Sequence, residues 1–225
     1  MLFRSPFDLG VVPVEVMQDA AARARFASGP TIDIAHVGLG VAVRAGAPKP
    51  EIGTAEAFKA SLLKAQSVAS IPESATGYSI ARVFARLGIT EAMQAKMKAQ
   101  PNPAQVVGVV ARGEVELGLF LINVLTAPGL DVVGPFPAEL QETVMFTAAL
   151  ASETGNAAAA GALVEFLKSP AAGAIIKSKG MNPGWLGRIA SDPKNWRCTR
   201  MRRRPSGPAF PGIRPWQPSR APDPQ

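Results

Sequence analysis

Short apolar runs alternate with helical patterns along most of this 225-residue chain, and this alternation constrains the fold more than any other feature. The run VELGLFLI at 115–122 is typical of a buried strand. The other predicted strands are residues 7–12, 36–44, 67–71, 130–133 and 143–150. Strands that alternate with helices favour helical crossovers and therefore parallel pairing. The sequence thus predicts an α/β fold with mostly parallel sheets.

Capping residues indicate where the helices begin and end. Thr54 is a good N-cap, Pro103 suits a first helical turn, and Gly88 and Gly113 suit helix ends. The predicted helices are residues 55–65, 76–87, 103–112, 156–168 and 170–180, with a further helical stretch after Pro13.

The positive charge of the chain is concentrated near its C-terminus. Residues 186–225 contain eight Arg and one Lys against two Asp, which accounts for the whole net charge of +7. The same segment has eight prolines and no apolar periodicity, so we predict a disordered basic Pro/Arg-rich tail at 186–225. A neutral body gives no electrostatic footprint for a phosphate backbone, which argues against specific nucleic-acid binding.

The scarcity of cysteine and histidine excludes several kinds of chemistry. Cys198 is the single cysteine and His36 the single histidine. A disulfide framework, a thiolate cluster or a multi-histidine metal site cannot be built from them. No nucleophile with a partner base can be assembled either, so the sequence predicts no metal, no cofactor and no enzymatic activity.

Three sequence blocks, taken together in this order and spacing, carry a resemblance to a known family. They are VGLGVAVRAG at 37–46, VARGEVELG at 110–118, and LVEFLKSPAA at 163–172 with its continuation to Gly180. The chain resembles the ModA-like, or molybdate-type, periplasmic substrate-binding proteins of ABC transporters over roughly residues 7–184.

The resemblance implies a fold of the periplasmic-binding-protein type II kind, with two α/β lobes joined at a hinge. Residues 1–46 and 144–184 would form the first lobe and residues 47–143 the second. The family carries a signal and a βαβ portion ahead of the first strand. The resemblance therefore implies an N-terminally truncated chain with an incomplete first lobe. It also implies a periplasmic location, although the chain as written, without a signal, would stay in the cytoplasm.

Two predicted helix starts match the ligand-facing positions of the family. Helix N-termini offer free N–H groups and partial positive charge, which suit a desolvated anion. By this resemblance the ligand-binding residues are Ser74, Ala75, Thr76, Gly77, Tyr78, Asn102, Ala104, Gln105 and Asn123. Ser74, Thr76 and Asn102 are also ordinary helix caps, a structural role that competes with ligand binding.

One position departs from the pattern of molybdate binders. Leu121 stands where those proteins have a tyrosine, so one hydroxyl donor is absent. Asn123 can substitute as a neutral donor, or it can simply satisfy the end of the strand. Molybdate itself is therefore not the predicted ligand.

The sequence favours a solute-binding component of an ABC importer, with a small anion, an oxyanion or an organic acid, between its lobes. Its partners would be that solute and a transporter permease, and the incomplete first lobe would favour self-association. No uninterrupted apolar run is long enough to predict a membrane span. The alternatives are a fragment without independent activity, a ligand-sensing domain, or an enzyme that has adopted this fold.

Overall fold

The computed structural model describes residues 6–29 and 31–184. The chain divides into two compact units, Met1–Ser191 and Asp192–Gln225, and all that follows concerns the first. The predicted disordered tail at 186–225 lies outside the described residues.

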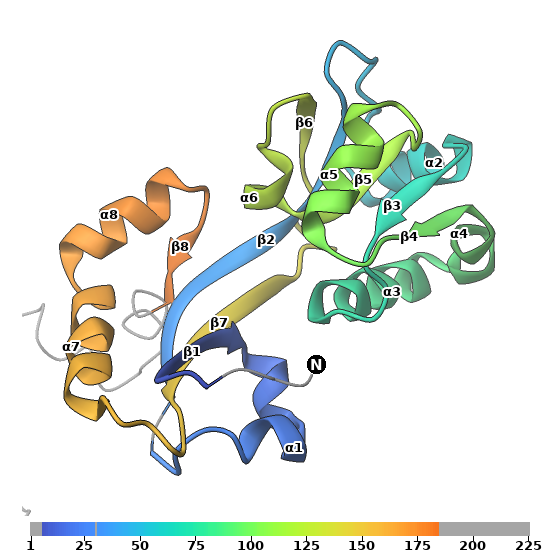
Figure 1. Cartoon of the computed structure of the whole chain (residues 1–225). Helices are drawn as coiled ribbons and strands as arrows, with labels where there is room; N and C mark the ends of the chain where they lie inside the picture. Colours follow the sequence, from blue (N-terminus) through green and yellow to red (C-terminus); the bar gives the residue numbers. More distant parts are fainter. Residues whose placement is uncertain (1–5, 30, 185–225) are drawn as a thin grey trace, which may run out of the picture. The chain divides into compact units, whose positions relative to one another are not determined.

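One eight-stranded sheet organises the described part of the chain (Figure 1). Its strand order is β1-β7-β2-β5-β3-β4, and β6 and β8 each pair with β2 outside this path. The strands are β1 (Leu9–Pro13), β2 (Ile32–Arg44), β3 (Val68–Ser70), β4 (Met97–Ala99), β5 (Leu117–Leu121), β6 (Leu130–Pro135), β7 (Thr143–Leu150) and β8 (Asn182–Pro183).

Strand β2 connects the two ends of the sheet. Its first half pairs with β7, from Ile32 opposite Ala148 to Gly38 opposite Thr143. Its second half pairs with β5 and β6. A single strand of 13 residues therefore runs through both ends, and its apolar side chains from Val37 to Val43 are buried on both faces of the sheet.

The α/β class is confirmed, but parallel pairing is confined to one end of the sheet. Among the described strands, only β3 with β4 and β3 with β5 pair in parallel. The remaining pairings, which involve β1, β2, β6, β7 and β8, are antiparallel. The prediction of mostly parallel sheets therefore holds for β5-β3-β4 and is wrong for the rest. In the rest of the sheet, strands that are distant in the sequence, such as β2 and β7, lie side by side and run in opposite directions.

Several helices begin directly after a residue whose side chain caps them. Side chains of Thr54, Ser74, Asn102 and Ser169 each accept a hydrogen bond from the N–H three residues on. The helices are η1 (Val14–Gln18, a 3₁₀ helix), α1 (Ala20–Arg23), α2 (Ala55–Lys64), α3 (Ala75–Leu87), α4 (Thr90–Lys96), α5 (Pro103–Ala111), α6 (Ile122–Leu125), α7 (Ala157–Leu167) and α8 (Pro170–Ser178). The short elements α4, α6, β4 and β8 were not predicted.

The main hydrophobic core surrounds β2, β5 and β3. Phe58 of α2 is almost completely buried and its ring centroid lies 4.7 Å from that of Phe136. Two smaller clusters pack at the other end of the sheet, one around Ile34 and Val164 and one around Val12. The largest body of buried apolar surface therefore supports the end of the sheet that contains the parallel strands.

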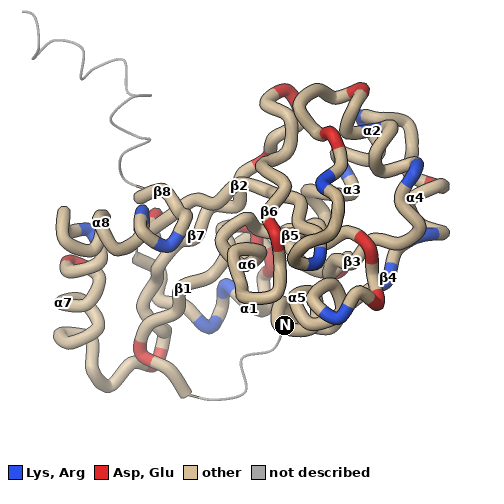
Figure 2. Tube along the Cα trace, turned by 90° about the horizontal axis from the view of Figure 1, so that it is seen from above, with Lys and Arg blue, Asp and Glu red and all other residues tan. Residues whose placement is uncertain are grey.

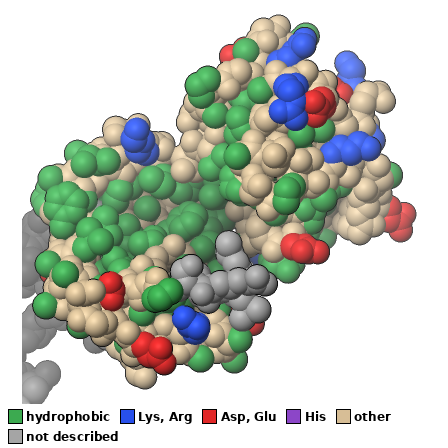
Figure 3. Space-filling model, in the orientation of Figure 1, with side chains coloured by type: hydrophobic (Ala, Val, Ile, Leu, Met, Phe, Trp, Pro, Cys, Tyr) green, Lys and Arg blue, Asp and Glu red, His purple; other side chains and the backbone are tan. Residues whose placement is uncertain are grey.

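The surface differs in character between the two ends of the sheet. Large hydrophobic side chains are exposed on α7 and α8, namely Leu163, Phe166 and Ile175, and Figure 3 shows a broad hydrophobic area at this end. Basic and acidic residues are interspersed along the described trace (Figure 2). Within that trace no single helix has the length and apolarity to cross a membrane, although α7 and α8 together, bent by 67°, meet both criteria.

The side chain of Gln141 holds the middle of β2 through two hydrogen bonds. Its Oε1 accepts from Leu39 N at 2.8 Å and its Nε2 donates to Leu39 O at 3.0 Å. We expect Gln141→Ala to lower the free energy of unfolding by about 2 kcal/mol, because both backbone groups of Leu39 lose a partner. Urea denaturation checks this, with Gln94→Ala on the exposed face of α4 as the control. A loss no larger than the control's would contradict the assigned role.

Candidate functional site

The three parallel strands bring their carboxyl ends to one edge of the sheet. Strand β3 leads into α3, β4 leads into α5, and β5 leads directly into α6. Because β5, β3 and β4 are neighbours and run in the same direction, the starts of these helices lie at the same edge. Ligands of open α/β sheets bind outside the carboxyl ends of strands, so this edge is the candidate site.

The start of α3 is built around Ser74. Its Oγ donates to Ile71 O at 2.7 Å and accepts from Gly77 N at 3.0 Å. The cap thus uses the N–H of Gly77, whereas the N–H groups of Ala75 and Thr76 belong to those that a helix start leaves for water or a ligand. The structural role of Ser74 as a cap is therefore observed directly.

The other predicted residues of α3 differ in exposure. The side chain of Thr76 is buried, with 4% of its surface exposed, and Tyr78 is 58% exposed. Gly77 is buried against the backbone of the preceding turn. The fold itself therefore makes least use of three groups at this helix start, namely the backbone of Ala75, the backbone of Thr76 and the ring of Tyr78.

The start of α5 has the same construction. Asn102 Oδ1 accepts from Gln105 N at 3.0 Å, and Pro103 occupies the first helical position, where no N–H is needed. Ala104 and Gln105 are exposed. The N–H of Ala104 is the remaining donor of this turn.

Asn123 lies where the candidate site meets the middle of β2. It follows β5, whose last residue Leu121 pairs with Leu39. Gly180 is its neighbour, since a Cβ there would lie 3.7 Å from Asn123 Cβ. Asn123 Oδ1 is buried and has no hydrogen-bond partner among the described residues. A buried, unpartnered amide oxygen costs free energy unless a donor group of a ligand or a water satisfies it.

One polar cluster near these helix starts was not predicted. Arg82 of α3 forms an ion pair with Glu142, just before β7, and its Nη2 donates to Ser79 Oγ at 2.9 Å. The hydrogen bond with Glu142 raises the pKa of Arg82 above its ordinary value, so the guanidinium is always charged. Sixty positions separate Arg82 from Glu142, and no sequence pattern signals a pairing over that distance.

The arrangement defines a class of protein. A β2 strand shared between two ends of one sheet, with several helix starts at a common edge, is also the fold of a solved periplasmic binding protein that superposes on this chain. Residues 3–182 match the family described as bacterial extracellular solute-binding protein, and the chain belongs to that family.

Individual relatives fall into two groups. The chain is 36% identical over 181 residues to an aconitate isomerase of Pseudomonas sp, a match covering 79% of this chain and 68% of that protein. It is 31% identical over 126 residues to the molybdate-binding protein ModA of Azotobacter vinelandii, covering 55% and 50%. The solved periplasmic molybdate-binding protein of Azotobacter vinelandii superposes with a TM-score of 0.63 at 20% identity, covering 79% of each chain. The resemblance to ModA-like proteins is thereby confirmed.

The prediction that the chain is not an enzyme is corrected by the first of these relatives. That protein is named as an enzyme and is similar to this chain over most of its length. The prediction was wrong because it searched for nucleophiles and metal-ligand sets. Enzymes can also act through a single positioned acid or base, which leaves no motif of the kind sought.

Proposed function

We propose that this chain binds a small polycarboxylic acid of the aconitate type and takes part in its isomerisation. The observation that carries the proposal is the 36% identity to an aconitate isomerase over 79% of the chain. The geometry of the candidate site is compatible with this substrate class.

The helix starts of α3 and α5 supply the electrostatic part of the proposal. Each presents backbone N–H groups and partial positive charge toward the edge of the sheet, which favours a carboxylate. The nine predicted ligand-binding residues are all uncharged, so the substrate would be held by dipoles and hydrogen bonds. Asn123 supports the proposal because its buried Oδ1 has no partner among the described residues and can accept from a protonated carboxyl group or a water, while the N–H groups of the same amide can donate to a carboxylate.

The proposed reaction conserves the composition of the substrate. A base removes a proton from the methylene carbon beside a carboxylate, and the carbon–hydrogen electron pair forms a new double bond to the central carbon. The electron pair of the original double bond then forms a new carbon–hydrogen bond by taking up a proton at the far carbon. One proton leaves, one is added, and the geometry about the new double bond can be cis or trans.

A second candidate function is binding without chemistry, in which the chain delivers a small anion to a permease of an ABC importer. The family match and the likeness to ModA favour it. For both candidates we propose a first lobe of residues 1–46 and 144–184, a second lobe of 47–143, and a periplasmic location. The course of β2 and β7 beside the middle of the sheet supports a hinge there.

The test is to incubate the full chain with cis-aconitate in D₂O and follow the proton spectrum. We expect trans-aconitate to accumulate and deuterium to enter the methylene position, because the base exchanges its proton with solvent. Calorimetric titration of the same preparation with cis-aconitate, trans-aconitate and molybdate measures binding independently of turnover.

The outcomes separate the two candidates. Binding of aconitate without deuterium exchange or turnover would leave a carboxylate-binding protein and refute the isomerase. Saturable binding of molybdate alone would favour the oxyanion importer. A folded chain that neither binds nor converts aconitate would refute the proposal. Gln66→Glu, at an exposed position just before β3 and so at the opposite end of that strand from the helix starts, serves as a control for a change in net charge away from the site.

A further inference from the structure

A cavity of about 320 Å³ lies between α3, α4 and the strands β3 and β4. Its walls come mainly from apolar residues of α3 and α4, and polar atoms are few. The lining residues are Ser70, Pro72, Gly77, Ile80, Ala81, Phe84, Thr90, Met93, Gln94 and Met97. None of the residues predicted from the sequence to bind ligand, apart from Gly77, contributes to this wall.

Ser70 supplies a polar group to this apolar wall. Its side chain is 1% exposed, and Oγ has no hydrogen-bond partner among the described residues. A hydroxyl taken out of water without a partner costs free energy, so buried hydroxyls are nearly always paired. Because Ser70 lies in the wall of the cavity, a molecule bound in the cavity can supply the missing hydrogen-bond partner of Ser70 Oγ.

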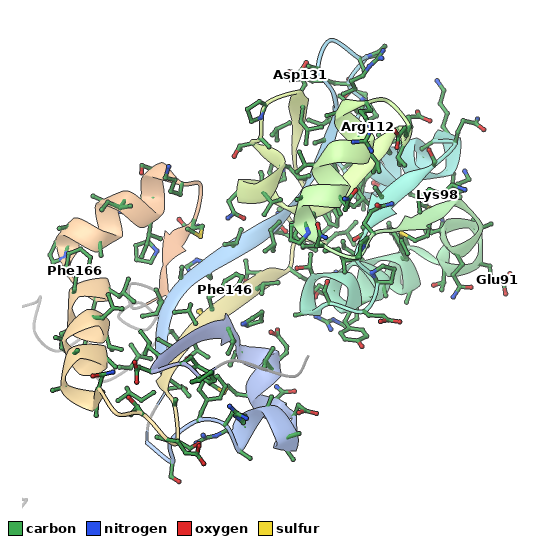
Figure 4. The ribbon with its side chains drawn as sticks, in the orientation of Figure 1. Glu91, Lys98, Arg112, Asp131, Phe146 and Phe166 are labelled. Atoms are coloured by element: carbon green, nitrogen blue, oxygen red, sulfur yellow. The ribbon has the colours of Figure 1, made fainter. Side chains whose placement is uncertain are left out.

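The lining residues carry no charge. Charged side chains of the same elements, Glu91 of α4 and Lys98 of β4, are exposed and extend from the outer side of this region (Figure 4). An anion entering such a cavity would lose hydration without gaining a counter-charge. The chemistry of the wall therefore differs from that of the helix starts, where an anion is favoured.

We propose that this cavity is a second binding site, for a small neutral molecule with an apolar body and one hydroxyl or carbonyl group. The apolar body would contact Ile80, Phe84 and Met93, and the polar group would exchange a hydrogen bond with Ser70 Oγ. An apolar cavity of about 150 Å³ accepts benzene, so this volume suits a ligand of roughly ten non-hydrogen atoms. The proposal is independent of the function proposed above.

The test uses 2-phenylethanol as the probe and the full chain labelled with ¹³C at its methionine methyl groups. Met93 and Met97 line the cavity, whereas Met145 and Met181 lie on or beside other strands. We expect saturable shifts confined to Met93 and Met97. Ethylbenzene, which lacks the hydroxyl, should bind about ten-fold more weakly, and phenylacetate, which is charged, should not bind.

Two variants make the result specific. Ala81 is exposed at the rim, so Ala81→Phe should close the mouth and abolish the shifts, while Ala85→Phe, on an exposed position of α3 outside the lining, should leave them intact. Ser70→Ala should remove the preference for 2-phenylethanol over ethylbenzene. Shifts that are absent, that spread to every methionine, or that survive Ala81→Phe would overturn the proposal. An unchanged preference in Ser70→Ala would overturn the role of Ser70.

Discussion

Replacing Gly77 with alanine is expected to destabilise the chain by about 3 kcal/mol or more. A Cβ at this position would lie 2.1 Å from Ile71 O and 2.4 Å from Pro72 O. Both contacts are with backbone atoms, which cannot move aside as a flexible side chain would. The first turn of α3 would have to shift away from the loop that follows β3.

The local hydrogen bonds explain why that shift is costly. Ser74 N donates to Ile71 O, and Ser74 Oγ donates to the same oxygen while accepting from Gly77 N. Displacing the helix start breaks this arrangement and uncovers buried surface of α3. Urea denaturation measures the loss, and a shifted start should also weaken ligand binding at the candidate site.

Gly161→Ala is the matched control for this prediction. Gly161 lies within α7, and no atom lies within 4 Å of the position its Cβ would take. Alanine there should raise the free energy of unfolding by about 0.5–1 kcal/mol, because glycine is the poorer helix former. Equal effects at the two glycines would show that helix propensity, not the close approach of backbone, governs position 77.

The sequence predicted best those features that depend on neighbouring residues. Thr54, Ser74 and Asn102 were predicted to cap helices, and each does, because capping is a contact over three positions. The helix starts of the candidate site belong to this group. Their gathering at one edge was not predicted, because it depends on the parallel pairing of β3 with β4 and β5, and β4 itself was missed.

Features that depend on distant residues were not predictable in the same way. The antiparallel pairing of β1 with β7 joins Leu9 to Leu150, and the ion pair of Arg82 with Glu142 spans 60 positions.

The helix α4 was missed because its N-cap position is Ile89, which forms no side-chain cap. The enzymatic character of the aconitate isomerase relative left no motif in the residues that local reasoning could find.

Replacing Asn123 with aspartate is expected to weaken the binding of cis-aconitate about a hundred-fold. Two like charges about 4 Å apart repel by roughly 1 kcal/mol in water and about 4 kcal/mol at the effective dielectric of a protein surface. A loss near the middle of that range corresponds to about a hundred-fold. The amide and the carboxylate have nearly the same shape, so the change acts through charge and hydrogen bonding. Calorimetric titration of the folded variant measures the effect.

Asn123→Leu separates charge repulsion from the loss of a polar partner. It removes the unpartnered amide oxygen, so the chain should be no less stable, but cis-aconitate should bind about ten-fold more weakly because the N–H donor that the amide offers to a carboxylate is also lost. Gln66→Glu adds the same charge just before β3 and should change binding less than two-fold if the effect at position 123 is local. If Asn123→Asp bound cis-aconitate as tightly as the parent chain, the amide would only satisfy the end of β5. The anion would then have to be held by the starts of α3 and α5 without it.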